Sequence, residues 1–164
     1  MIAHVMEGLI LVAAMVFIHG VGTLVLLRWI VLYRPHWERH GGLMVNTFSL
    51  TWIVGFLVLL HILEVSVWGL YFYWRGVLPD LETSAYFSLL TYTTVGYGDV
   101  VLSKDWRLMG TSEALVGILM TAWSTALLIS VVNSVHLKTI ESWKKKDQEK
   151  ADPHRFAKEK EDHR

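Results

Sequence analysis

One stretch of the chain carries residue types that could do chemistry through the backbone, the heptapeptide TTVGYGD at positions 93–99. Gly96 and Gly98 alternate with Val95 and Tyr97, and glycine adopts positive φ at no steric cost. Successive carbonyl groups can therefore turn to one side while the side chains point away. Such a strip of oxygens could replace the water around a dehydrated cation. One chain supplies one wall of this site, and four copies around an axis would close it into rings.

The composition is more apolar than that of an ordinary soluble domain. The chain has 164 residues, of which 53% are hydrophobic and 18% charged, whereas soluble domains carry about 25% charged residues. The absence of cysteine excludes disulfides, thiolate metal sites and cysteine nucleophiles. Residues 137–164 hold nine Lys or Arg and seven Asp or Glu, so the rest of the chain is poor in charge.

Three apolar stretches are long enough to cross a bilayer, which takes about 20 residues. They cover residues 9–27, 48–74 and about 108–135. The alternative is a soluble bundle of very apolar helices, but the lengths and flanks favour a membrane. The first stretch lacks a preceding Lys or Arg and a small-residue cleavage pattern, so we expect a retained helix rather than a signal peptide.

The placement of basic residues predicts the orientation. Residues 28–46 carry three arginines against one acid, the tail is basic at Lys138 and Lys144–Lys146, and the N-terminus has no Lys or Arg. By the positive-inside rule, the N-terminus lies outside, and the loop 28–46 and the C-terminus are cytoplasmic. We therefore expect a multi-pass protein of the cell (inner) membrane.

The segment between the second and third stretches, residues 75–107, is too apolar for a plain connection. Pro79 and Asp80 form a turn and cap signal ahead of a short apolar run, which predicts a helix over about 82–93. That helix is too short to span and would be re-entrant, which requires protein or water around its non-helical part. A peripheral amphipathic helix followed by an ordinary turn is the alternative.

In this setting, TTVGYGD resembles the selectivity filter of the potassium channel superfamily, whose TVGYG carbonyls replace the hydration shell of K⁺. The chain is similar to small bacterial channels built as helix, pore loop and helix, over residues 48–135, with an extra N-terminal transmembrane helix. The resemblance implies an all-α membrane protein with three transmembrane helices, a re-entrant pore helix and a filter loop. It also implies a homotetramer that conducts K⁺ passively.

The resemblance assigns roles to residues around the filter. Asp99 would concentrate cations at the outer mouth, and Tyr97 would point outward against pore-helix aromatics. The filter would be Thr94, Val95, Gly96, Tyr97 and Gly98, with K⁺ held at the first four and support from Thr93, Asp99, Tyr86 and Phe87.

Two departures from the family pattern concern the surroundings of the filter. Some relatives have a pore-helix glutamate that bonds the aspartate behind the filter, and this chain has Leu90 there. Asp99 therefore needs another partner, Tyr86 or a water. The proline that usually follows the aspartate is also missing. Inactivation at the filter therefore does not carry over from the family.

Four residues are candidates for gating. Gly117, nineteen residues beyond Gly98, is either a hinge or a site of close helix packing. His61 and Glu64 lie one turn apart in the second stretch, and with Glu113 they are expected to form a buried cluster. A hydrogen-bonded structural pair is favoured over a proton-sensitive brace, and a metal site is less expected. His19 is expected to face another helix.

The predicted organisation has three parts: an extra helix with a basic loop (1–46), a pore domain (47–136), and a charged tail (137–164) that continues the third helix. No stretch has the repeated arginines of a voltage sensor. The tail either is solvated, forms a tetramer-stabilising bundle, or contacts anionic lipid at Lys144, Lys145 and Lys146. No enzyme site, cofactor or nucleic-acid partner is expected, K⁺ being only the permeant ion. The alternative functions are a non-conducting accessory subunit and the channel-like loop of a coupled K⁺ transporter.

Overall fold

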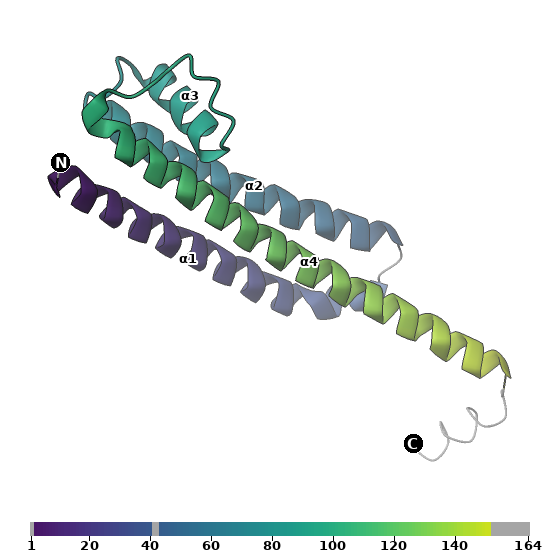
Figure 1. The fold of residues 1–164 in the computed structure, drawn as a ribbon. Helices are drawn as coiled ribbons and strands as arrows, with labels where there is room; N and C mark the ends of the chain where they lie inside the picture. The colour runs from purple at the N-terminus through teal and green to yellow at the C-terminus, as the bar shows by residue number, and fades with distance from the viewer. Residues whose placement is uncertain (1, 41–42, 152–164) are drawn as a thin grey trace. The chain divides into compact units, whose positions relative to one another are not determined.

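The computed structural model describes residues 2–40 and 43–151, and within these residues all regular structure is helical (Figure 1). The elements are α1 (Ile2–His40), α2 (Leu43–Trp74), α3 (Leu81–Tyr92), the short 3₁₀ helix η1 (Lys104–Trp106) and α4 (Arg107–Ala151). The predicted all-α class is confirmed, and α3 lies within one residue of the predicted pore helix.

Three of these helices are long and apolar enough to cross a membrane: Val5–Leu32, Thr47–Trp74 and Lys104–Ser134. Large apolar side chains remain exposed along them, among them Phe17 at 70%, Leu24 at 66% and Leu59 at 66%. A helix that is apolar on its outward face as well as its packed face is typical of a membrane span. The chain is therefore a multi-pass membrane protein.

The first helix is longer than the sequence predicted. A loop was expected over 28–46, but α1 continues to His40 and α2 begins at Leu43. The residues after Arg28, WIVLYR, contain neither glycine nor proline, and the helix continues through Pro35 up to the glycine pair Gly41-Gly42. The basic arginines of this region therefore lie on a helical extension.

The chain divides into two compact units, Met1–Ala126 and Leu127–Arg164. The first contains α1, α2, α3, η1 and the beginning of α4, and it holds the buried core. The described part of the second is the remainder of α4 up to Ala151, which includes the start of the mixed-charge tail.

The core of the first unit lies where α3 packs on α2 and on the beginning of α4. Its largest members are Trp68 and Phe72 of α2 and Phe87 and Tyr92 of α3. The helices approach closely at Gly69, where a methyl group would lie 3.1 Å from the Cα of Ala85. Figure 1 shows α3 placed against one end of α2. This packing fixes the position of the loop that follows α3.

Candidate functional site

The start of α3 is fixed by Asp80, the N-cap residue just before the helix. The backbone N–H of Thr83 donates to Oδ1 of Asp80 at 2.7 Å, and the Thr83 hydroxyl donates to Oδ2 at 2.9 Å. These bonds to the charged form lower the pKa of Asp80. The predicted cap is confirmed, and it sets where the helix begins.

The segment that follows α3 has an alternating backbone. Thr94, Gly96 and Gly98 have φ of 61°, 46° and 80°, with Val95 and Tyr97 between them. The N–H groups of Val95 and Gly96 both donate to the carbonyl of Leu90, at 2.9 and 3.2 Å. The loop is therefore tied to the last turn of α3, and its alternation is the conformation that the two glycines predicted.

Thr94 was not expected to share this conformation. A β-branched residue with positive φ is a true outlier, and the left-handed region costs an L-residue about 1–2 kcal/mol. Strain of this kind is found where surrounding structure holds a functional backbone in place. Thr93, just before it, donates its hydroxyl to the Leu89 carbonyl at 2.6 Å, which anchors the end of α3.

The surroundings of the loop are partly as predicted. The Tyr86 hydroxyl donates to Oδ2 of Asp99 at 2.8 Å, which confirms Tyr86 as the substitute partner expected because of Leu90. This hydrogen bond lowers the pKa of Asp99 and raises that of Tyr86. Tyr97 is 74% exposed within one chain.

The Phe87 ring packs inside the chain, and its predicted contact with Tyr97 stays a prediction. It is buried in the core, with its ring edge-on to Phe72 at 5.4 Å between centroids. Its contacts follow from the packing of α3 on α2, and it also lines the pocket beside the loop. Gly117 of α4 lies against the backbone of Tyr92, the last residue of α3, which supports the close-packing interpretation of this glycine.

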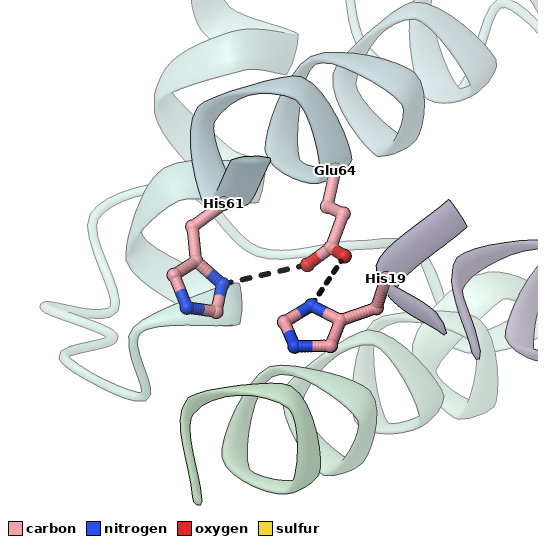
Figure 2. Close-up of side chains that lie close together, drawn as sticks. All are labelled: His19, His61 and Glu64. Carbon is pink, nitrogen blue, oxygen red and sulfur yellow. Dashed lines mark hydrogen bonds and ion pairs between the residues drawn. The ribbon is translucent and has the colours of Figure 1, made fainter. Parts of the chain in front are cut away.

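A buried polar cluster lies beside the end of α3 (Figure 2). Nδ1 of His19, from α1, is 2.9 Å from Oε1 of Glu64, and Nδ1 of His61 is 3.4 Å from Oε2. The Tyr92 hydroxyl donates to Oε2 of Glu64 and lies 2.9 Å from Nδ1 of His61. On the far side of His19, Nε2 is 3.3 Å from the hydroxyl of Ser124 in α4.

This cluster corrects the prediction that Glu113 would complete it. The third member is His19, because α1 packs on α2 at this level. Glu113 of α4 is fully buried, but among the described residues it makes none of the hydrogen bonds that join His19, His61, Glu64 and Tyr92. The i, i+3 spacing revealed the pair on α2, and the prediction that His19 faces another helix is confirmed by its contact with Glu64, whereas no local signal in the sequence pointed to Tyr92 or Ser124.

A second polar contact attaches α1 near its N-terminus. The Tyr71 hydroxyl donates to Oε2 of Glu7 at 2.6 Å, and Arg75 forms a 3.1 Å ion pair with the same oxygen. The Arg75 guanidinium also lies over the Trp106 ring, 5.3 Å from its centroid. Helix α1 is thus fixed to the rest of the first unit at two places along its length.

In the tail, the proposed lipid contact is only partly described. Lys144 is exposed, and the side chains of Lys145 and Lys146 lie outside the described residues.

The fold and the loop define a membrane protein in which a short re-entrant helix presents a strained backbone strip between two spanning helices. A family model described as "Ion channel" matches residues 45–134, more than half of the chain. The chain belongs to this ion channel family. The match runs from the start of α2 through the loop into α4, and α1 lies outside it. Neither a curated protein nor a solved structure is significantly similar to the chain.

Proposed function

We propose that the protein is a potassium-selective channel that conducts K⁺ passively through a homotetrameric pore, with Thr94–Gly98 as its selectivity filter. The supporting observation is the alternation of positive φ at Thr94, Gly96 and Gly98. Alternating handedness lets successive carbonyls face one line, and rings of such carbonyls coordinate dehydrated K⁺ in channels with the TVGYG sequence. The ions would be held at Thr94, Val95, Gly96 and Tyr97.

The tetramer is needed because one chain supplies a single wall of the filter. Within one chain the loop is open, with Val95 50% and Tyr97 74% exposed. A pocket of about 560 Å³ adjoins it, lined by residues of α3, the loop and α4, including Leu90, Thr94 and Gly110. Neighbouring copies around an axis would cover these surfaces. No spanning stretch carries regularly repeated arginines, so we propose conduction without a voltage sensor.

The orientation belongs to the same proposal. Asp99 and its partner Tyr86 would face the outside, where the carboxylate raises the local cation concentration. The N-terminus would be outside and the C-terminus in the cytoplasm of the cell (inner) membrane, where Lys144, Lys145 and Lys146 would meet anionic lipid headgroups.

The test is a flux assay on the purified full chain in liposomes. We expect K⁺ flux that Ba²⁺ blocks, with Na⁺ excluded. Absence of flux would favour a non-conducting accessory subunit, and flux strictly coupled to another ion would favour a transporter. Equal Na⁺ and K⁺ flux would leave an ion channel but overturn the proposed selectivity.

A matched pair of variants tests the filter assignment. Gly96→Ala places a side chain at φ 46°, where alanine is strained, although nothing lies within 4 Å of the added methyl group. Gly55→Ala adds the same methyl group to open space on α2. We expect loss of selectivity or conduction only in Gly96→Ala, with the tetramer retained in both. Wild-type K⁺ flux in Gly96→Ala would refute the assignment.

A further inference from the structure

His19, His61 and Glu64 bring three metal-binding atoms together inside the membrane-spanning part of the chain. Each residue offers one ligand atom, and these atoms all lie within 4.8 Å of one another. In Figure 2 both imidazole rings turn a nitrogen toward the same carboxylate, one from α1 and one from α2. We propose that these three residues bind a divalent transition-metal ion of the zinc class. The site is independent of the proposed potassium selectivity.

Two of the three separations between ligand atoms are close to those of a metal site. The Nδ1–Oε distances are 2.9 Å from His19 and 3.4 Å from His61. Two ligands in a tetrahedral zinc site, each about 2.0–2.2 Å from the metal, lie roughly 3.3 Å apart. A small rotation of the Glu64 carboxylate would therefore open the space for an ion.

The donor set also selects the class of metal. Two imidazole nitrogens and one carboxylate are common ligands of zinc, and the set leaves a fourth position open. Mg²⁺ and Ca²⁺ prefer sites made of oxygen ligands. The Tyr92 hydroxyl, which contacts both Glu64 and His61, stands beside this fourth position. A water held by Tyr92, or its own oxygen, would complete the coordination.

A residue outside the three ligands, Ser124, orients one of them. Nε2 of His19 lies 3.3 Å from the Ser124 hydroxyl. If Nε2 carries the proton and donates to this hydroxyl, Nδ1 keeps its lone pair for the metal. Metal-bound histidines nearly always have such a partner on the other ring nitrogen. Ser124 is itself 6% exposed, so this bond is protected from water.

The buried negative charge of Glu64 favours the binding of a cation. Glu64 is completely buried in a spanning helix, where an ionised carboxylate is costly unless it is paired. In the part of the chain that the structure describes, its ion-pair partners are the two histidines and not a Lys or Arg. A divalent ion would supply the missing positive charge. His61 keeps 21% of its side-chain exposure, which leaves an approach to the site within one chain.

A metal bound at this site would cross-link α1 to the proposed pore domain. His19 belongs to α1, whereas His61 and Glu64 belong to α2, and Tyr92 is the last residue of α3, two positions before the filter. Binding would therefore join α1 to α2 beside the end of α3.

The test uses the full chain, purified in detergent and stripped with a chelator. Zn²⁺ retained after desalting and the visible spectrum of added Co²⁺ report the site. We expect about one ion per chain, and an affinity at least 10-fold lower in His19→Gln and His61→Gln. Ser124→Ala keeps all three ligands and should weaken binding about 10–100-fold. Glu113→Gln, which changes the other buried carboxylate, should bind like the wild type. The comparison among variants shows whether Zn²⁺ binds at this cluster, because the chain has eight histidines in all and the others could bind Zn²⁺ too.

A thermal measurement on the wild type covers the case in which the ligand variants do not fold. A metal that binds only the folded state raises the unfolding temperature, so we expect Zn²⁺ to raise it and Mg²⁺ at the same concentration to leave it unchanged. The proposal is overturned if the wild type shows neither retention of Zn²⁺ nor this shift, or if folded His19→Gln and Ser124→Ala bind Zn²⁺ as tightly as the wild type. The cluster would then be a hydrogen-bonded network that shares protons.

Discussion

The backbone of Tyr92 occupies the place that a side chain at position 117 would need. A methyl group on Gly117 would lie 2.0 Å from the carbonyl oxygen of Tyr92 and 2.9 Å from its carbonyl carbon. The end of α3 is thus pressed against α4 immediately before the loop 94–98. Gly117 has a packing role in this structure, and its use as a hinge stays a prediction.

We predict that Gly117→Ala destabilises the protein. Backbone atoms cannot move aside as a flexible side chain can, so the end of α3 must shift away from α4. Overpacking typically costs about 1–3 kcal/mol, and we expect that loss in the free energy of unfolding, measured by denaturant titration in detergent. Gly55→Ala, with nothing within 4 Å of its methyl group, is the control and should be at least as stable as the wild type, because alanine is the better helix former.

The hinge hypothesis makes a different prediction for the same variant. If Gly117 serves only to bend α4, Gly117→Ala should keep its stability while its open probability changes. Unchanged stability together with altered gating would therefore contradict the packing role.

We predict that Tyr86→Phe makes conduction more sensitive to external acid. The Tyr86 hydroxyl lowers the pKa of Asp99, so its removal should return that pKa toward the ordinary aspartate value of about 3.9. In the wild type, Asp99 keeps its charge below this value and loses it only as the pH falls through the lowered pKa. The variant should lose K⁺ conductance at a higher pH, as recorded in bilayers over a series of external pH values.

The control for this experiment is Tyr73→Phe, which removes a hydroxyl from a half-exposed tyrosine of α2. Its pH profile should match that of the wild type. Identical profiles for Tyr86→Phe and the wild type would show that Asp99 does not contribute its charge to conduction.

The sequence predicted those features that depend on local chemistry. Apolar length located the spanning helices, Asp80 marked the start of α3, and the two glycines indicated the backbone alternation of the loop. Leu90 correctly implied a new partner for Asp99. In each case, the signal and the structure it specifies lie within a few residues of each other.

Contacts between helices were harder to predict for a physical reason. In a soluble helix the apolar face points to the core, but these helices are apolar toward lipid as well, so hydrophobic periodicity does not identify the packed face. The sequence therefore indicated that His19 faces another helix but not which residues it meets there, and Glu7 gave no sign that it would reach α2. Glu113 was assigned to the cluster because it is charged and apolar residues surround it, which says nothing about its neighbours. Positive φ at Thr94 follows from the loop as a whole and not from threonine itself.

We predict that Glu7→Gln weakens the attachment of α1 only slightly. Glu7 and Arg75 are each about one-third exposed, at 32% and 33%, and exposed ion pairs contribute about 0.2–1 kcal/mol. The Tyr71 hydroxyl can still donate to the oxygen of the new amide. Limited proteolysis between α1 and α2 should proceed at a nearly unchanged rate. Release of α1 in this variant would show that the pair near the N-terminus of α1 dominates the attachment.

We predict a strong energetic coupling between Tyr92 and Glu64. Tyr92→Phe removes a donor from a fully buried carboxylate, and leaving such a group short of a partner costs about 1–3 kcal/mol. Glu64→Gln removes the charge that the hydroxyl meets, so Tyr92→Phe should cost less in that background. A double-mutant cycle on the free energy of unfolding, with chelator present to exclude metal, should give a coupling of about 0.5–3 kcal/mol. Ser66→Ala, whose hydroxyl bonds only the backbone of its own helix at 2.7 Å among the contacts described, should show no coupling to Tyr92→Phe. Additive effects of Tyr92→Phe and Glu64→Gln would mean that the buried cluster does not hold the end of α3, and that packing against Gly117 alone positions the filter.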